Sequence, residues 1–298
     1  MTDTLAGLKQ KQNGARDLQS VVRAMKALAA ASIGQYERSV GALAAYAHTV
    51  ELGLSVCLRD SRPVGGRKSA ATDRIGAIVF GSDQGLVGRF NEVLAEYALQ
   101  TLATLPGVPH LWAVGERMQA RLQEQGTLVR GFFPVPSSVK GITPLVGRIL
   151  IDSGAAGDDR DLDEVYLFYN RPREGVVYTP VSQRLLPLDE TWRRQLADSP
   201  WPTRQLPEVI GGGPPTLRML IREFLFVSLF RACAESLASE NASRLAAMQR
   251  ADTNIEELLE DLTGRLHQLR QSTIDEELFD VVSGFEALTN HRRGGGPT

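Results

Sequence analysis

The sequence predicts an α/β protein with long α-helices. The N- and C-terminal helices form an antiparallel coiled coil, and a small doubly wound (Rossmann-like) α/β domain lies between them. Three observations predict this fold. The segments Thr4–Leu58 and 216–296 contain no proline, whereas thirteen of the fifteen prolines fall between Pro106 and Pro215, which separates two helical ends from a folded middle. Apolar residues in both ends recur at steps of four and three. The middle alternates β-branched runs with helical stretches.

The expected domain organisation follows from these boundaries. We expect an N-terminal coiled-coil helix at 1–60, a linker at 61–72, an α/β domain at 73–210, a C-terminal coiled-coil helix at 214–290 and a flexible tail at 291–298. The first helix could run about 80 Å, and Thr216–Asn290 about 110 Å, at the rise of an α-helix. Two such helices at opposite ends of one chain describe a stiff shaft on a small base.

The apolar spacing of the terminal segments is typical of a coiled-coil seam. In the first segment the seam residues are Leu18, Val22, Met25, Ala29, Ser32, Tyr36, Val40, Leu43, Ala47, Val50 and Leu54. In the last they are Ile255, Leu259, Leu262, Leu266, Leu269, Ile274, Leu278, Val281, Phe285 and Leu288. The alternative is two separate amphipathic helices on a core. We favour the pair, because a helix this long needs a companion of similar length to cover its stripe.

The middle segment is predicted to contain strands that alternate with helices. The expected strands are Ile75–Phe80, His110–Val114, Thr127–Arg130, Val165–Tyr169 and Val176–Leu186. The expected helices are Asn91–Leu105, Glu116–Glu124 and Thr143–Asp152. Pro215 suits the first turn of the helix that follows.

Composition narrows the class of partner. The 33 basic and 35 acidic residues nearly cancel, so neither nucleic acid nor direct lipid insertion is expected. We expect no apolar run near the roughly 20 residues that cross a bilayer, because Leu220–Ala234 is interrupted by charges. No secretory signal is visible. Cys57 and Cys233 are too few for a disulfide framework. We favour two buried thiols over one disulfide between the long helices.

The segment 81–91 follows a strand and precedes a helix, where a phosphate loop would lie. It lacks the Lys-Ser/Thr pair of a P-loop and does not match GxGxxG, so we favour a structural turn. The turn residues are Gly81, Asp83, Gln84, Gly85, Gly88 and Asn91. The four histidines have no metal-ligand spacing, and we predict no catalytic residue, cofactor or metal.

Small residues concentrate in the long helices. They are Ala27, Ala29, Ala30 and Ala31 in one, and Ala232, Ala234, Ala238, Ser239 and Ala242 in the other. They fit either a smooth shaft that turns inside a sleeve or simply close helix packing.

Four stretches of the chain, at 22–30, 82–91, 234–250 and 270–284, match in order the motifs of one known family. They resemble the gamma subunit, the central stalk, of F-type ATP synthases. Residues 22–30 (VRAMKALAA) are similar to that family's ITKAMxMVAA, and 82–91 (SDQGLVGRFN) to its (S/T)DRGLCGxxN. Residues 234–250 (AESLASENASRLAAMQR) and 270–284 (RQSTIDEELFDVVSG) resemble its C-terminal motifs. The resemblance covers nearly the whole chain.

The resemblance implies a non-catalytic rotor on the cytoplasmic face of the bacterial inner membrane. Its partners would be a hexamer of alpha and beta subunits, the epsilon subunit and the membrane c-ring. Rotation would couple ion translocation to ATP synthesis or hydrolysis. The matching motifs assign rotor–stator contact to Arg23, Met25, Lys26, Arg244, Arg270, Gln271 and Asp275.

The chain departs from the family pattern at several positions. Asp275 stands where the family has threonine, so an acidic partner loop would be repelled there. Gln84 and Val87 replace Arg and Cys, and Asp252–Leu258 replaces DNGGSLI. These changes resemble the alternative bacterial group called N-ATPases. The sequence does not identify the coupled ion, H⁺ or Na⁺. A nucleotide-binding α/β enzyme and a passive coiled-coil tether are the alternative functions.

Overall fold

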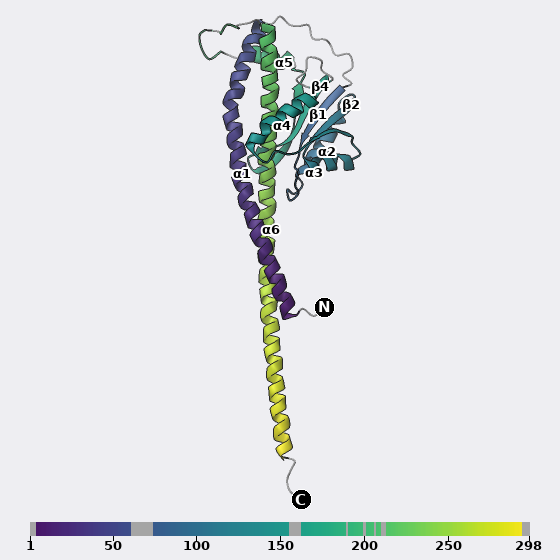
Figure 1. The fold of residues 1–298 in the computed structure, drawn as a ribbon, viewed down its shortest axis with the longest axis vertical. Helices are drawn as coiled ribbons and strands as arrows, with labels where there is room; N and C mark the ends of the chain where they lie inside the picture. The colour runs from purple at the N-terminus through teal and green to yellow at the C-terminus, as the bar shows by residue number, and fades with distance from the viewer. Residues whose placement is uncertain are drawn as a thin grey trace. The chain divides into compact units, whose positions relative to one another are not determined.

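The computed structural model describes residues 4–60, 74–154, 162–188, 190–198, 201–205, 207–209 and 213–293. The expected linker at 61–72 lies outside these residues, as do 294–298 of the expected tail. Figure 1 shows the elements in chain order. They are α1 (Leu5–Asp60), β1 (Arg74–Phe80), α2 (Phe90–Leu102), β2 (Val108–Val114), α3 (Glu116–Glu124), β3 (Val129–Phe133), α4 (Val139–Asp152), β4 (Glu164–Arg173), β5 (Val176–Leu186), α5 (Glu190–Ala197) and α6 (Gly213–Arg293).

The chain divides into two compact units. Unit 1 contains Met1–Ala27 and Met248–Thr298, and unit 2 contains Leu28–Ala247. Each unit therefore takes one part of α1 and one part of α6. Unit 2 also holds every strand and the short helices α2 to α5.

Unit 2 is built on a five-stranded sheet in the order β3-β2-β1-β4-β5. The first four strands are parallel, and β5 pairs antiparallel with β4 at the edge. The strand order reverses beside β1, because the chain adds β2 and β3 on one side and β4 on the other. This is the topology of a doubly wound sheet, as the alternating pattern predicted.

The two faces of this sheet are covered by different helices (Figure 1). Alternate residues of β1 point to opposite faces, as in any strand. Ala77 and Val79 pack with α2 and α3, while Ile78 and Phe80 pack with α4 and with α6. The long C-terminal helix is thus part of the core of unit 2 and not an appendage to it.

Unit 1 is an antiparallel helix pair. Gln12 Nε2 donates to Thr263 Oγ1 at 3.0 Å, and Arg23 Nη2 donates to Glu256 Oε1 at 2.8 Å. The buried apolar residues of its α1 part are Leu8, Ala15 and Val22, and those of its α6 part are Met248, Ile255 and Leu262. Both series repeat every seven residues, which is the period of one coiled-coil column. The predicted antiparallel pairing is confirmed.

The predicted seam is wrong at several positions. Leu18 is 54% exposed because Ala15 and Val22 already fill this level of the two-helix contact. Ile274, Leu278 and Val281 are also exposed. The Gln12–Thr263 contact sets the register, so α1 begins opposite a position near Arg270 and does not cover the residues beyond it.

Several elements of unit 2 differ in extent from the sequence prediction. Helix α2 ends at Leu102 and not at Leu105, and β4 continues to Arg173 and not only to Tyr169. The strand expected at Thr127–Arg130 is β3, Val129–Phe133. The strand passes through Gly131, where glycine is needed because a Cβ atom would lie only 2.6 Å from Cδ1 of the Trp112 ring. The expected helix Thr143–Asp152 begins four residues earlier, at Val139, with Pro144 inside it. Helix α5 was not predicted.

Helix α1 is apolar enough, by length and composition, to cross a membrane, which corrects the expectation that no such run exists. Between Arg38 and Arg59 its only charged residue is Glu51. In unit 2, however, Val50, Leu54 and Cys57 of this segment are buried against protein. Only 28% of the apolar stretch is buried, so packing against protein accounts for only part of it.

Candidate functional site

The loop after β1 is held in place by its own side chains. A Cβ atom on Gly81 would lie 2.4 Å from Met118 Cβ and 2.6 Å from Asn91 Oδ1, so glycine is required. Asn91 Oδ1 accepts the backbone N–H of Ser82 at 3.0 Å, and Asn91 Nδ2 donates to Ser82 Oγ at 2.8 Å. A phosphate loop would present such an N–H group to its ligand. In this protein the N–H group of Ser82 already donates to the side chain of Asn91.

Asp83 joins this loop to two neighbouring segments. Its Oδ1 accepts the backbone N–H of Glu116 at 2.9 Å, and its Oδ2 accepts that of Val135 at 2.9 Å. The Gln84 carbonyl accepts the Ser82 hydroxyl at 2.9 Å. These contacts support the interpretation of segment 81–91 as a structural turn.

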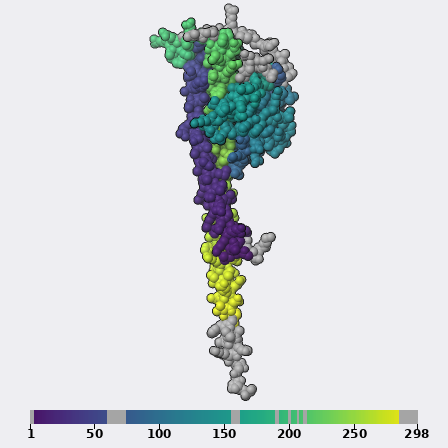
Figure 2. Space-filling view, viewed as in Figure 1, coloured from purple at the N-terminus to yellow at the C-terminus, as the bar shows by residue number. Residues whose placement is uncertain are grey.

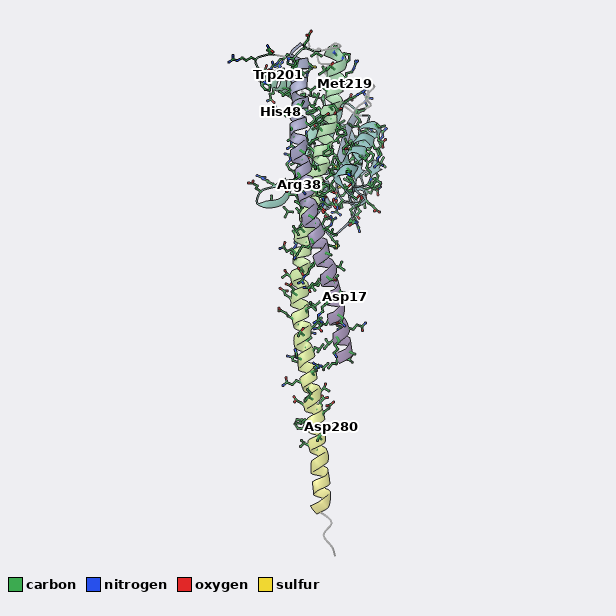
Figure 3. All side chains as sticks on the ribbon, turned by 60° about the vertical axis from the view of Figure 1, so that its left-hand side comes forward. Asp17, Arg38, His48, Trp201, Met219 and Asp280 are labelled. Atoms are coloured by element: carbon green, nitrogen blue, oxygen red, sulfur yellow. The ribbon has the colours of Figure 1, made fainter. Side chains whose placement is uncertain are left out.

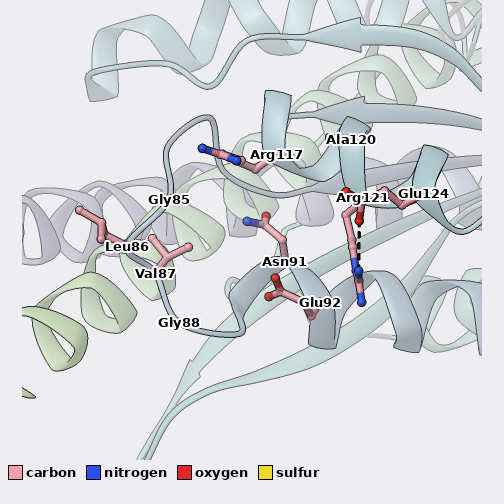
Figure 4. A pocket seen from close by; sticks show the side chains of 10 residues that line it. All are labelled: Gly85, Leu86, Val87, Gly88, Asn91, Glu92, Arg117, Ala120, Arg121 and Glu124. Atoms are coloured by element: carbon pink, nitrogen blue, oxygen red, sulfur yellow. Dashed lines mark hydrogen bonds and ion pairs between the residues drawn. The ribbon is translucent and has the colours of Figure 1, made fainter.

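A pocket of about 630 Å³ opens beside the same loop, and Figure 4 shows the side chains that line it. Gly88 has a positive φ of 58°, and Leu86 holds φ 62°, which is rare for a residue with a side chain. Arg117 and Arg121 line the pocket together with Glu92 and Glu124. The formal charges of these four side chains cancel, so the pocket lacks the net positive charge that attracts a phosphate group.

The carboxyl ends of β1 and β4 carry the contacts that sequence analysis missed. In doubly wound proteins, ligands bind in the crevice at this point, where the strand order reverses. In this chain, three serine hydroxyls of α6 donate to backbone carbonyls there. The pairs are Ser236 to Phe80 at 3.1 Å, Ser239 to Asn170 at 3.0 Å and Ser243 to Val87 at 2.6 Å. Their spacing of three and then four residues places the serines on one helix face, but it does not by itself indicate a hydrogen-bonding role.

A carboxylate on α6 reinforces this contact. Glu235 Oε2 accepts Nε of Arg171 in β4 at 2.8 Å, and its Oε1 accepts Nε of Arg231 at 2.7 Å. Arg171 also donates to the hydroxyl of the buried Tyr169. The two arginines compensate the charge of a carboxylate that is only 8% exposed.

Arg244 lies in unit 2 and already has intramolecular partners. Its Nη2 donates to Glu240 Oε1 at 2.7 Å, and both side chains are largely buried. Burial raises the pKa of Glu240, while the nearby guanidinium of Arg244 works against that rise. Its assignment to rotor–stator contact stays a prediction.

In unit 1, Arg23 and Lys26 join α1 to α6. Lys26 Nζ lies 2.8 Å from Asp252 Oδ2, and Arg23 Nε lies 3.2 Å from Asp252 Oδ1. These cations, Lys26 foremost, lower the pKa of the Asp252 carboxyl. Met25 lies beside them, half-buried. The aspartate of the segment that departs from the family pattern thus pairs with the cations of the N-terminal motif.

The other candidate contact residues lie on the uncovered part of α6. Arg270, Gln271 and Asp275 are all exposed. The same stretch exposes the apolar side chains of Ile274, Leu278, Phe279, Val281 and Val282. Figure 3 labels Asp280 in this stretch and Asp17 on α1, and Figure 2 shows the surface of this part of α6 in yellow. Large apolar side chains left exposed in this way mark a surface that binds another molecule.

Cys57 and Cys233 are both buried and are not joined by a disulfide, as we favoured. Burial raises the pKa of the Cys233 thiol. Among the residues that the structure describes, no group of three or more His, Cys, Asp or Glu side chains could hold a metal ion.

Comparison with known proteins gives a consistent result. A family model described as ATP synthase matches residues 4–288. The ATP synthase gamma chain of Salinibacter ruber is 27% identical over 303 residues, which cover 95% of this chain and 98% of that one. The gamma chain of Nitrosomonas eutropha is 30% identical over 231 residues, covering 72% and 74% respectively.

The fold is also found among solved structures. A chain in the cryo-EM structure of the Euglena gracilis mitochondrial ATP synthase, comprising OSCP, F1 and c-ring, superposes with a TM-score of 0.66. The superposition covers 99% of this chain and 97% of the other at 14% sequence identity, so it establishes a shared fold.

Proposed function

Because the chain belongs to the ATP synthase gamma-subunit family, we propose that it acts as a rotor whose turning couples ion translocation to ATP synthesis or hydrolysis. It is a non-catalytic subunit of the central stalk of an F-type ATP synthase, and catalysis takes place in the beta subunits. It is peripheral to a membrane-associated complex.

The observation that carries the proposal is the uncovered end of α6 in unit 1. The helix pair of this unit ends near Arg270, and the exposed apolar side chains beyond it require a partner. A hexamer of alpha and beta subunits around this end would cover them. Figure 2 shows this stretch without a second helix over the visible face.

The coupling follows from differential contact energy. A rotor with unequal faces stabilises a different conformation of each subunit around it, and each orientation shifts their populations accordingly. The surface of unit 1 differs from one side to the other in this sense. On the side where α1 meets α6 it carries the ion-paired residues Arg23, Lys26 and Asp252. The remaining surface of α6 carries Gln271 and Asp275.

We assign rotor–stator contact to Arg23, Met25 and Lys26 on α1 and to Arg270, Gln271 and Asp275 on α6. The exposure of the α6 residues supports this assignment. We also keep Arg244 in the set, as its weakest member, because its side chain is only 13% exposed, whereas those of Arg23 and Lys26 are 54% and 34% exposed.

The partners of unit 2 are proposed to be the epsilon subunit and the c-ring. We place the assembly at the cytoplasmic face of a bacterial inner membrane, in the N-ATPase group, on the strength of residues 82–91 and 252–258. The c-ring and its stator would select H⁺ or Na⁺.

The nucleotide-binding alternative is disfavoured by the geometry of unit 2. Side chains of α6 occupy the crevice at the carboxyl ends of the strands, and Asn91 takes the N–H group that a phosphate would need. ATP should therefore leave the thermal unfolding of the isolated chain unchanged, both in the natural protein and in Gly85→Ala.

Reconstitution tests the rotor proposal directly. The full chain is co-expressed with the alpha, beta and epsilon subunits and the membrane sector from the same organism. ATP-dependent membrane potential is then measured in vesicles with a voltage-sensitive dye. We expect a stable complex whose ATP hydrolysis generates the potential. A chain that remains outside an otherwise assembled, coupled complex would refute the proposal.

A further inference from the structure

Three hydroxyl groups fix the position of α6 on the sheet of unit 2. Ser236, Ser239 and Ser243 are at most 7% exposed. Their acceptors are the carbonyls of Phe80, at the end of β1, of Asn170, near the end of β4, and of Val87, in the loop after β1. The helix therefore bonds to three separate segments of the α/β part.

These bonds specify both the rotation and the register of the helix. Positions 236, 239 and 243 are spaced by three and four residues, so they lie on one face. A turn of α6 about its own axis, or a slide along it, would break all three bonds together. Each break would leave a buried carbonyl without a donor, which is costly.

The neighbouring alanines do not provide this specificity. Ala232, Ala234 and Ala238 are at most 2% exposed and allow close packing. A smooth alanine face, however, makes similar contacts after a small displacement, whereas directional hydrogen bonds do not. The small residues of α6 therefore serve tight packing here, the second of the two interpretations that the sequence allowed.

The Glu235 carboxylate adds a charged contact beside Ser236. It binds Arg171 of β4 and Arg231 of α6 at the same time, with distances of 2.8 and 2.7 Å. Charge-assisted hydrogen bonds are shorter and stronger than neutral ones. A sideways movement of α6 would separate Glu235 from Arg171.

We propose that Ser236, Ser239, Ser243 and the Glu235–Arg171 pair form the torque-transmitting joint between the α/β part and α6. This inference rests on the proposed function as a rotor. The crevice that holds a ligand in other doubly wound proteins holds the protein's own helix here, and the joint converts a push on the sheet into rotation of the helix. These residues position α6 and have no catalytic part.

The test compares pumping with hydrolysis in the assembled complex. The variants are the triple change S236A/S239A/S243A and the single changes S243A and S243T, all in the full chain. Each lost hydroxyl should lower the ratio of docked to undocked α6 by about tenfold, the equivalent of one hydrogen bond. We expect the membrane potential generated per ATP hydrolysed to fall severalfold in the triple variant and less in S243A. S243T, which keeps the hydroxyl, should restore it.

Matched controls separate this role from general destabilisation. Ser39 and Thr49 also lie in unit 2, but their hydroxyls donate to their own helix, to the carbonyls of Tyr36 and Ala45. S39A and T49A should leave the ratio of pumping to hydrolysis unchanged. Hydrogen exchange of the isolated chain gives a second readout, because the amides of residues 82–88 should exchange faster in the triple variant than in the controls.

The outcomes distinguish the joint from the rotor proposal. An assembled triple variant that pumps as much per ATP as the natural chain would overturn the joint and leave the rotor proposal intact. If the triple variant does not assemble, S243A and S243T decide: equal coupling in these two would also overturn it. A natural chain that neither assembles nor couples would refute the proposed function, and the joint with it.

Discussion

Helix α6 is held in two different ways in the two units. In unit 2, Leu225, Leu229 and Leu237 pack against the sheet. Serine hydroxyls make most of the polar contacts with the sheet there, and the Glu235–Arg171 ion pair adds one charged contact. In unit 1 the same helix has one partner helix, buries the column Met248, Ile255 and Leu262, and makes its polar contacts with partly exposed ions.

The difference shows how one helix can serve two purposes. Neutral, directional bonds can hold a surface from which water is excluded, because they carry no charge that burial would penalise. Ion pairs suit a surface that water still reaches. Unit 2 therefore resembles a rigid core, and unit 1 resembles a slender pair with side chains available to partners.

The largest effect is expected from overpacking the loop of unit 2. Gly81→Ala places a Cβ 2.4 Å from Met118 Cβ, and it should lower the free energy of unfolding by about 3 kcal/mol. Urea denaturation of the isolated chain, followed through tryptophan fluorescence, measures it. Gly85→Ala is the control, because its nearest neighbour lies 4.0 Å away. Equal losses in the two variants would contradict the packing described here.

The next largest loss of stability is expected in unit 1. Leu262→Ala removes a side chain that is 5% exposed, and it should destabilise the helix pair by about 2 kcal/mol. Leu258→Ala, four residues away and 47% exposed, should change stability by less than about 0.5 kcal/mol. Hydrogen exchange of the amides of Leu8 to Val22 reports the difference. If Leu262→Ala lowers the hydrogen-exchange protection of the strands of unit 2 by the same amount, the two units do not open independently.

A smaller effect depends on pH. The folded pKa of Asp252 lies below its ordinary value of 3.8, so its ion pairs stabilise the native state above that pH. This contribution should be lost as the pH falls through the folded pKa. Asp252→Asn should therefore destabilise unit 1 at pH 7 but have little effect in strong acid. Asp261→Asn is the control, since the ion pair between Asp261 and Arg265 lies within α6. A pH-independent loss in Asp252→Asn would contradict the ion-pair account.

The smallest effect on the isolated chain concerns the uncovered end of α6. Phe279 is 72% exposed, so Phe279→Ala should leave the unfolding curve of the isolated chain unchanged. The same change should weaken binding to the alpha and beta subunits in a pull-down titration. Loss of stability in the isolated chain would mean that this side chain packs within the protein.

The sequence predicted the elements better than the contacts between them. Proline distribution and heptad spacing located both long helices within a few residues, because these signals are local. Alternation located most strands, but not the extent of β3, since a glycine is a poor strand former by itself and Trp112 is distant in sequence.

The candidate site was predictable in part. The turn residues Gly81, Asp83 and Asn91 were identified, and their geometry explains each of them. The serine contacts were missed because serine at 236, 239 and 243 has no distinctive pattern until the acceptor carbonyls are known. Leu18 was misassigned because step spacing alone does not say which of two adjacent columns a single partner helix covers.

A reversible disulfide between rotor and stator tests the central claim most directly. Gln271→Cys is paired with a cysteine in the facing loop of the beta subunit, while the buried Cys57 and Cys233 stay unreactive. The control is the double change Gln12→Cys and Thr263→Cys, which links α1 to α6 where the natural side chains lie 3.0 Å apart. The account predicts that oxidation stops ATP turnover only in the rotor–stator pair and that reduction restores it. Undiminished turnover with the beta subunit linked to residue 271 would contradict it.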